Sequence, residues 1–426
     1  MLVQPLHRST TLMFAALAIA ATLAITAVLP ASVEAAPKGP QSVRFATFNA
    51  SLNRFNAGDL VNDLSTPNNA QAAAVAEIIQ RARPDVLLIN EFDYDPAAVD
   101  LFRDNYLEVG HNGAEPIEYE YYFIDESNTG VPTGCAVCDF NNDGVVGGPD
   151  DAYGFGFFPG QFGMLVLSKY PIDHDAVRTF QEFLWADMPG ARLPDDPTTP
   201  KPADWYSEEE LEVFRLSSKS HWDVPIDIGG SIVHFLVSHP TPPVFDGPED
   251  RNGTRNFDEI RFWADYVTPG AGGYIYDDPR EDGSQVFGGL KPGSKFVIAG
   301  DQNSDPLDGD SIPGAIQQLL ENPRINTTVT PDSVGAVEAS LLQGVANLTH
   351  QSDPRYDTAD FSDTAPGNLR ADYVLPSRNL RIQDAAVFWP VQASPLFYLT
   401  GVFPFPSSDH RLVWVDVHVR GAKRGH

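Results

Sequence analysis

Cysteine is nearly absent from this chain of 426 residues, where it occurs only as Cys135 and Cys138. Two cysteines exclude a zinc site with four cysteine ligands, and they leave either a small local disulfide or a pair of reduced thiols. Basic residues are scarce as well, with 28 Lys and Arg against 58 Asp and Glu and a formal net charge of -30 at pH 7. Diffuse binding to nucleic acid depends on Lys and Arg contacts to phosphates, so this charge argues against it.

Long hydrophobic runs are missing beyond the N-terminus, and only the stretch from Leu12 to Leu29 is apolar enough to be considered for crossing a bilayer. Basic residues precede this run and small residues around Ala36 follow it, which is typical of a secretory signal peptide. A retained membrane anchor is disfavoured because the run is short and rich in alanine. We therefore expect residues 1–35 to be a signal peptide and the protein to be secreted, either extracellular or periplasmic.

One apolar run ends abruptly in short polar side chains. Residues 296–299 are typical of a strand buried on both faces, and Gly300 lets the backbone turn before the first carboxylate. Asp301 and Asn303 lie two residues apart, so both can point to one side of an extended chain. A carboxylate beside a neutral amide suits a divalent cation and the phosphate that it polarises. An ordinary polar turn after a strand is the alternative.

Four other strand-like segments carry polar groups at their ends. Residues 43–49 end in Asn49, residues 85–91 end in Glu91, and residues 232–239 end in His239. The pair Asp409 and His410 comes just before the strand-like residues 412–417. Polar groups placed repeatedly at strand ends predict one shared site.

The segment between the first two strands is helical in pattern. Asn69 can cap a helix that extends to Ala82, and Pro84 stops it. Strand, helix and strand in succession indicate a layered α/β fold that places Asn49 and Glu91 at the same edge.

The motifs T-F-N, D-V-L-L-I-N-E, S-H-P, G-D-Q-N, R-A-D-Y-V-L and S-D-H occur in this order between Val43 and Val417. In this order the set resembles the endonuclease/exonuclease/phosphatase superfamily, the DNase I-like metal-dependent phosphoesterases. The resemblance implies one domain over residues 41–420. Its fold class would be α/β, a four-layer sandwich in which two mixed β-sheets pack face to face and are flanked by helices.

The resemblance also implies a catalytic divalent metal, Mg²⁺ or Mn²⁺. Asn49 and Glu91 match the positions that hold the metal in the family. Asp301 and Asp409 are further candidate ligands. A metal held there would neutralise charge that builds on the phosphate oxygens.

The remaining matched residues suggest an acid–base pair. His410, oriented by Asp372, would be the base that activates water, and His239 the acid that protonates the leaving group. Asn303 would hold a phosphate oxygen. Asp301 is expected both to bind the metal and to act as a catalytic residue. The division between base and acid is a hypothesis, as is the number of metals.

A second metal site is predicted by spacing within residues 139–150. Oxygen-bearing side chains occupy loop positions one, three, five and twelve, with glycine at six, which is typical of an EF-hand-like calcium loop and similar to dockerin loops. We expect a calcium-loop insertion near 135–151 with a structural Ca²⁺. Its ligands would be Asp139, Asn141, Asp143, the Val145 carbonyl and Asp150.

Two further segments are interpreted more loosely. Residues 214–221 alternate like a strand, and Lys219 and His221 would lie near the cleft if this strand pairs beside the one ending at His239. A solvated face is the alternative. Residues 322–368 show little apolar periodicity and are predicted to be a long loop with one short helix.

The leading interpretation is a secreted Mg²⁺-dependent phosphoesterase that cleaves a phosphodiester or phosphomonoester by attack of water. An extracellular nuclease is the first alternative, and a catalytically inactive, calcium-stabilised binding protein on the same fold is the second. The acidic charge favours a small molecule or a lipid headgroup over long nucleic acid as substrate. We expect a monomer, and no feature indicates a stable protein partner.

Overall fold

The computed structural model describes residues 41–280 and 282–420. The chain divides into two units, Met1–Pro37 and Lys38–His426, and all described residues belong to the second. The expected signal peptide, residues 1–35, lies outside the described residues. Within the described part of the chain, no helix has both the length and the apolarity that a membrane span requires.

The first sheet has six strands in the order β12-β13-β1-β2-β4-β3. β1 and β2 are parallel, whereas the other neighbours are antiparallel, so the sheet is mixed. Its strands are β1 (Gln41–Leu52), β2 (Val86–Phe92), β3 (Tyr121–Phe123), β4 (Met164–Ser168), β12 (Arg381–Val387) and β13 (Val413–Val419).

The second sheet has five strands in the order β11-β8-β7-β6-β5, and its one parallel pair is β7 and β8. A small hairpin-like pair, β9 and β10, lies apart from both sheets in the hydrogen-bonding pattern. The strands are β5 (Arg178–Thr179), β6 (His221–Asp227), β7 (Ile232–Ser238), β8 (Lys295–Asp301), β9 (Ala359–Asp360), β10 (Asn368–Leu369) and β11 (Asp372–Pro376).

The two sheets pack face to face through alternate residues of their central strands. In β2, Val86 and Leu88 join the core between the sheets, whereas Leu87 and Ile89 join the core on the outer face. This alternation follows from the two-residue period of a strand, and it explains why the strand is apolar throughout. Phe45 of the first sheet and Phe235 of the second meet in the shared core, with ring centroids 5.5 Å apart.

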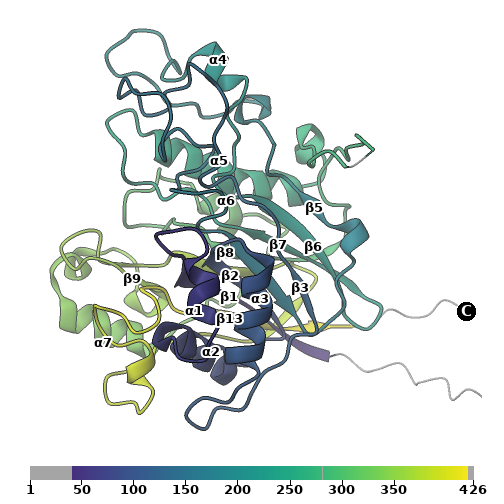
Figure 1. Cartoon of the computed structure of the whole chain (residues 1–426), viewed down its shortest axis with the longest axis vertical. Helices are drawn as coiled ribbons and strands as arrows, with labels where there is room; N and C mark the ends of the chain where they lie inside the picture. Colours follow the sequence, from purple (N-terminus) through teal and green to yellow (C-terminus); the bar gives the residue numbers. More distant parts are fainter. Residues whose placement is uncertain (1–40, 281, 421–426) are drawn as a thin grey trace, which may run out of the picture. The chain divides into compact units, whose positions relative to one another are not determined.

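Helices cover the outer face of each sheet. The first sheet is covered by α1 (Asp59–Leu64), α2 (Ala70–Ala82) and α3 (Pro96–Phe102), whose buried residues share one core with β1, β2 and β4. The second is covered by α5 (Arg251–Val267) and α6 (Gln317–Leu320) (Figure 1), and α4 (Glu208–Leu211) packs Leu211 against the same core. The predicted four-layer α/β sandwich is therefore confirmed.

The predicted helix before β2 is confirmed with its cap. The Asn69 side chain accepts a hydrogen bond from the Ala72 backbone N–H at 3.0 Å, which satisfies one of the free donors at the helix start. The helix ends at Ala82, and Arg83 adopts a left-handed conformation (φ 55°) before Pro84.

The prediction of a strand over residues 214–221 is wrong for most of that segment, because β6 begins only at His221. The backbone before it is bonded elsewhere: the Leu216 N–H donates to the Phe183 carbonyl and the Ser218 N–H to the Glu259 carboxylate. Since its backbone groups are used by loops and a helix side chain, the segment cannot extend the sheet.

The region of residues 322–368 contains more structure than the predicted loop with one short helix. It includes α7 (Val334–Gln343), two 3₁₀ segments (Val345–Thr349 and Pro354–Tyr356), and β9. In α7 several apolar side chains, such as Val334 and Leu341, are exposed. Because the apolar residues do not form one buried stripe, periodicity gave a weak signal there.

Candidate active site

The polar residues predicted at the strand ends meet at one edge of the sandwich. The Asn49 Nδ2 at the end of β1 donates to Glu91 Oε1 of β2 and to Asp301 Oδ2 of β8, both at 3.1 Å. Two carboxylates from different sheets therefore converge on one amide group. This placement follows from the parallel pairs β1–β2 and β7–β8, whose carboxyl ends lie at the same edge.

Asn90 connects the two sheets directly beneath this cluster. Its Oδ1 accepts the Asp301 backbone N–H at 3.2 Å, and its Nδ2 donates to the Ser238 carbonyl at 3.4 Å. Asn90 is fully buried, and sequence reasoning gave it no role because its partners lie on another sheet. Asn90 is a polar residue inside a run of apolar residues, one position before Glu91. This break in the apolar pattern is the feature of the sequence that could have indicated a structural role for it.

The backbone at the strand ends is unusual. Glu91 (φ 58°) and Asn303 (φ 50°) both adopt left-handed conformations, which are costly for residues other than glycine. Gly300 has φ 150°, and a Cβ atom there would collide with the Ser238 carbonyl. Glycine is therefore required where β8 passes close to β7, a reason that differs from the predicted one, which was a turn before Asp301.

Two histidines lie on either side of the Asp301 carboxylate. His239 Nε2 is 3.4 Å from Asp301 Oδ2, and His410 Nε2 is 3.5 Å from the same oxygen. Both rings are almost completely buried. The structure thus brings together the two histidines that the sequence indicated from distant segments.

His410 is held by a chain of hydrogen bonds. Its Nδ1 lies 2.8 Å from Asp372 Oδ2, and the Thr358 hydroxyl donates to that same oxygen at 2.8 Å. Asp372 stands opposite Asp301 in the β8–β11 register, which sets the distance between the two carboxylates. Thr358 was missed from the sequence, because it lies in a segment predicted to be loop and its contact is purely tertiary.

The other expected residues line the same cleft, a cavity of ≈ 610 Å³. Asn303 donates from Nδ2 to the Pro240 carbonyl at 3.1 Å. Asp409 accepts a long hydrogen bond of 3.4 Å from the Ser408 hydroxyl and lies in a bend before β13, as the adjacency of Asp409 and His410 required.

Burial and neighbouring charges shift the pKa values of the two histidines in opposite directions. Burial lowers the pKa of His239 to about 4, and the charge of Lys219 acts in the same direction. Burial also opposes the charged form of His410, but the Asp372 and Asp301 carboxylates raise its pKa well above the ordinary value. Without a bound metal, His239 is therefore neutral and His410 charged near neutral pH.

The pKa values of the Glu91 and Asp301 carboxylates also shift in opposite directions. Burial raises the pKa of Glu91, against the opposing hydrogen bond from Asn49. Burial acts on Asp301 in the same sense, yet the charge of His410 and the hydrogen bond from His239 hold the Asp301 pKa below its usual range. Asp301 is thus a permanent anion at the centre of the site.

The donor set fits a divalent cation. Glu91 and Asp301 supply hard carboxylate oxygens that converge on one point, and the Asn49 amide needs only to present its oxygen there in place of its nitrogen. Asp301, Asp372 and His410 also lie within 4.8 Å of one another. Asp372 is already bonded to His410 and Thr358, so the first set is the better candidate.

The predicted calcium loop is folded around its carboxylates. Asp139 accepts the backbone N–H groups of Asp143 and Gly144, and Asp143 accepts that of Val145 at 2.8 Å. Asn141 accepts the Asp143 N–H through Oδ1. Cys135 and Cys138, just before the loop, form a disulfide, which resolves the alternative left open by the sequence.

At the end of the loop, the carboxylate that turns back into the loop is not the one predicted from the EF-hand-like spacing. Asp151, one residue after the expected ligand Asp150, turns back and accepts the N–H groups of Phe140 and Gly147, both at 2.7 Å. Asp150 is exposed and lies on the wall of a neighbouring cavity. Calcium binding by this loop stays a prediction.

The model of the Endonuclease/Exonuclease/phosphatase family matches residues 46–410. No curated protein sequence matches the chain.

Solved structures share the fold at low identity. An endonuclease/exonuclease/phosphatase from Beutenbergia cavernae DSM 12333 has a TM-score of 0.45 and 14% identity, covering 90% of this chain and 73% of that one. A family protein from Leptotrichia buccalis C-1013-b has a TM-score of 0.43 and 12% identity, covering 88% and 100%. Sphingomyelinase C from Streptomyces griseocarneus has a TM-score of 0.43 and 14% identity, covering 88% and 99%. Likenesses this low carry no argument about activity.

The opposite protonation of the two histidines can be measured directly. In metal-free protein, the ring ¹⁵N shifts of His239 should titrate near pH 4, because burial disfavours its charged form. Those of His410 should titrate well above 6.5, because two carboxylates stabilise its charge. Two-dimensional NMR of the imidazole nitrogens tests this, with His239→Gln and His410→Gln used for assignment. Coincident titrations of both rings near 6.5 would contradict the described electrostatics.

Proposed function

The chain belongs to the Endonuclease/Exonuclease/phosphatase family, and on this premise we propose that it is a secreted, Mg²⁺-dependent hydrolase of a phosphodiester or phosphomonoester. Members of this family are hydrolases that act on phosphoester bonds. The observation that carries the proposal is the convergence of Glu91 and Asp301 on the Asn49 amide, with His239 and His410 on either side of Asp301.

The metal would be held by Glu91, Asp301 and the Asn49 amide oxygen, with Asp409 at the edge of the same cleft. These are oxygen donors, the ligands that Mg²⁺ and Mn²⁺ prefer. A divalent cation bound there supplies positive charge for the phosphate oxygens. The two-carboxylate arrangement supports this choice, because a divalent cation offsets the repulsion between two carboxylates that converge on one point.

Residues of the chain would position the phosphate and move protons. Asn303 would donate its amide N–H to a phosphate oxygen. His410 would accept a proton from water at Nε2, while Asp372 fixes its Nδ1 in the donor form. His239 would donate a proton from Nε2 to the leaving oxygen.

These roles require a neutral His410 and a charged His239, the reverse of the metal-free state. Positive charge bound beside Asp301 lowers the pKa of His410, because it opposes a second cation. The negative charge of a bound phosphate raises the pKa of His239 for the opposite reason. Loading the site therefore moves each histidine toward the form that its role needs.

The disulfide supports the proposal that the protein is exported, because disulfides persist mainly in oxidising compartments. A net charge of -30 supports a small phosphoester or a lipid headgroup over long nucleic acid as the substrate.

A nuclease and an inactive calcium-stabilised binding protein are the competing proposals. The assembled site favours the enzyme, since a binding protein does not need two buried histidines around one carboxylate. We propose that the protein acts as a monomer.

The first test is metal-dependent turnover of a chromogenic phosphodiester such as bis(4-nitrophenyl) phosphate. EDTA should abolish turnover, and added Mg²⁺ should restore it. Glu91→Gln keeps the shape but removes the anionic ligand, so it should lower activity and raise the Mg²⁺ concentration for half-activation. Glu118→Gln, at an exposed glutamate, is the matched control. An unchanged metal titration in Glu91→Gln would move the metal site elsewhere, and no turnover of any phosphoester by metal-loaded protein would remove the proposed function.

The second test concerns the base. His410→Ala should lower kcat by at least about a hundredfold, the lower range for losing a general acid or base. Asp372→Asn should act in the same direction but less severely, because it only orients the ring. His174→Ala, at an exposed histidine, should leave kcat unchanged. Near-normal turnover by folded His410→Ala protein would exclude His410 from the mechanism.

The third test separates calcium from catalysis. Calcium binding to the folded state should raise Tm in proportion to the logarithm of free calcium above its Kd. Asp143→Ala should abolish this shift and leave Mg²⁺-dependent turnover largely unchanged at low temperature, because the loop ligands come from one segment outside the catalytic cluster. Asp104→Ala, at an exposed aspartate, is the control. A folded Asp143→Ala protein without turnover would show that the loop takes part in catalysis.

A further inference from the structure

A second cavity of ≈ 560 Å³ adjoins the catalytic cleft. Glu91 and His239 line both cavities, so a phosphate held at the proposed catalytic centre would have one substituent directed toward the second cavity. The volume falls in the range of pockets that bind small molecules, roughly 300–1,000 Å³. This cavity is called the side pocket below.

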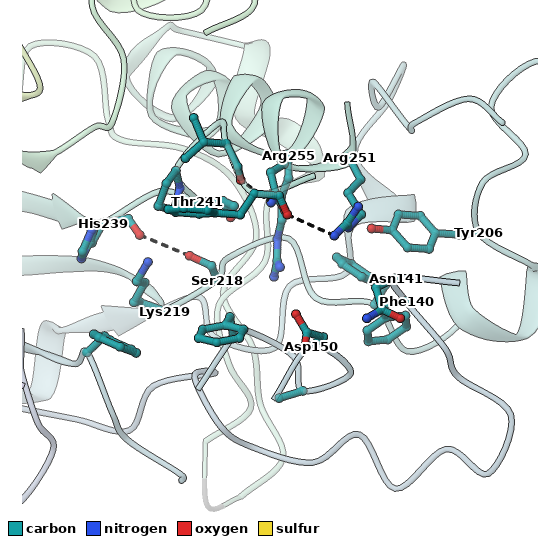
Figure 2. A pocket seen from close by; sticks show the side chains of 18 of the residues that line it. Phe140, Asn141, Asp150, Tyr206, Ser218, Lys219, His239, Thr241, Arg251 and Arg255 are labelled. Atoms are coloured by element: carbon teal, nitrogen blue, oxygen red, sulfur yellow. Dashed lines mark hydrogen bonds between the residues drawn. The ribbon is translucent and has the colours of Figure 1, made fainter. Parts of the chain in front are cut away.

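Much of the side pocket wall consists of aromatic rings from two long insertions, residues 124–163 between β3 and β4 and residues 180–220 between β5 and β6. Phe140, Tyr206 and Phe214 form one packed group, in which ring centroids lie 4.5 Å apart for Phe140 and Phe214 and 4.7 Å apart for Tyr206 and Phe214. Figure 2 shows Phe140 and Tyr206 at the far end of the pocket from His239 and Lys219. The walls therefore offer ring faces and edges, the surfaces against which another aromatic ring packs well.

Aromatic rings also continue from the pocket to the surface. Phe155 lines the pocket and is 49% exposed, and its ring contacts that of Phe157, which in turn contacts Phe55. Phe245, which is 87% exposed, lines both the side pocket and the catalytic cleft. Contiguous exposed apolar surface, rather than a single exposed ring, is typical of a binding site, and these rings form such a surface beside the pocket.

Unpartnered polar groups lie among these rings. Lys219 and Thr241 line the pocket and are each only 7% exposed, and the Thr241 hydroxyl is buried without a hydrogen-bond partner within the described residues. His239 Nδ1 is likewise buried without a partner. Figure 2 places Lys219 and Thr241 beside His239 at one end of the pocket. Buried polar groups without partners are costly, so a ligand that brings polar atoms to this end of the pocket would be favoured.

The far end of the pocket is polar as well. Arg255 stacks on Phe214 at 4.7 Å, and Arg251 and Asn141 lie nearby in Figure 2. Arg255 already donates to backbone carbonyls, but a hydrocarbon chain placed there would leave the remaining polar atoms of Arg251 and Asn141 without hydrogen bonds. A planar ring with polar substituents would pack against the aromatic walls and bond to the polar groups at both ends.

We propose that the side pocket binds an aromatic group bearing hydrogen-bonding substituents, carried on the phosphoester whose phosphate lies at Glu91 and His239. This assignment of substrate class rests on the proposed function. Two sources share the chemistry, a nucleobase and a substituted aryl group. The pocket is a chamber for one such group, and its walls come from insertions that also carry the predicted calcium loop.

The experiment measures binding of non-hydrolysable phosphonates to the Mg²⁺-loaded protein by isothermal titration calorimetry. The probes are 4-aminobenzylphosphonate, an adenine-bearing alkylphosphonate, hexylphosphonate and methylphosphonate. At least one ring-bearing probe should bind about tenfold or more tightly than both methylphosphonate and hexylphosphonate. The tighter of the two ring-bearing probes identifies the source. Equal affinities for all probes, or tightest binding of hexylphosphonate, would overturn the assignment.

Two neighbouring phenylalanines give a matched pair of variants. Phe155→Ala should weaken binding of the ring-bearing probe about threefold to tenfold and leave methylphosphonate unaffected. Phe157→Ala, on the same loop and 53% exposed but outside the pocket lining, should change neither. Ala152→Phe, which fills the pocket, should weaken ring binding more strongly than Phe155→Ala. Equal effects of Phe155→Ala and Phe157→Ala would overturn the assignment.

The binding experiment and the turnover experiment test the two proposals independently. Ring-selective binding without metal-dependent hydrolysis of any phosphoester would remove the proposed function and keep the pocket. Metal-dependent hydrolysis without ring selectivity would remove the pocket assignment and keep the proposed function.

Discussion

The buried carboxylate of Asp301 is the constraint around which the site is organised. It is 1% exposed and remains ionised because Asn49, His239 and His410 all approach it. Removing such a charge from water costs several kcal/mol, and only close partners and hydrogen bonds offset that cost. Each partner comes from a different element, so the edge of the sandwich must assemble as a whole before the anion is stabilised. Asn90, which binds the Asp301 backbone and the Ser238 carbonyl, helps to hold the elements in that arrangement.

The strands and the loops at this edge have different roles. Asn49, Glu91 and Asp301 belong to the strands β1, β2 and β8 themselves, which limits their motion. The long insertions between β3 and β6 instead build the aromatic walls beside the site. A rigid catalytic edge with a variable chamber at its side is how one fold supports different specificities. The disulfide Cys135–Cys138 lies in one of these insertions, where a long loop has few backbone partners of its own.

Much of the fold and the cluster could be predicted from the sequence. The apolar runs before Asn49, Glu91, Asp301 and His239 marked central strands, because a strand buried on both faces must be apolar throughout. Edge strand β12 was not anticipated, since it pairs with one neighbour only and its residues are mostly exposed or half-buried. Residues 214–220 were misjudged as strand, because alternation in sequence does not reveal where the backbone hydrogen bonds go.

Local patterns in the chain show which chemical groups lie at the ends of its central strands, because apolar runs and polar tips can be recognised without knowing distant contacts. How these groups act on one another depends on the folded arrangement. The support of Asp372 by Thr358, the burial of Lys219 beside His239 and the opposite protonation of the two histidines depend on distances between segments far apart in the chain. Such distances, and the exclusion of water that makes them effective, arise only when both sheets and the insertions pack together.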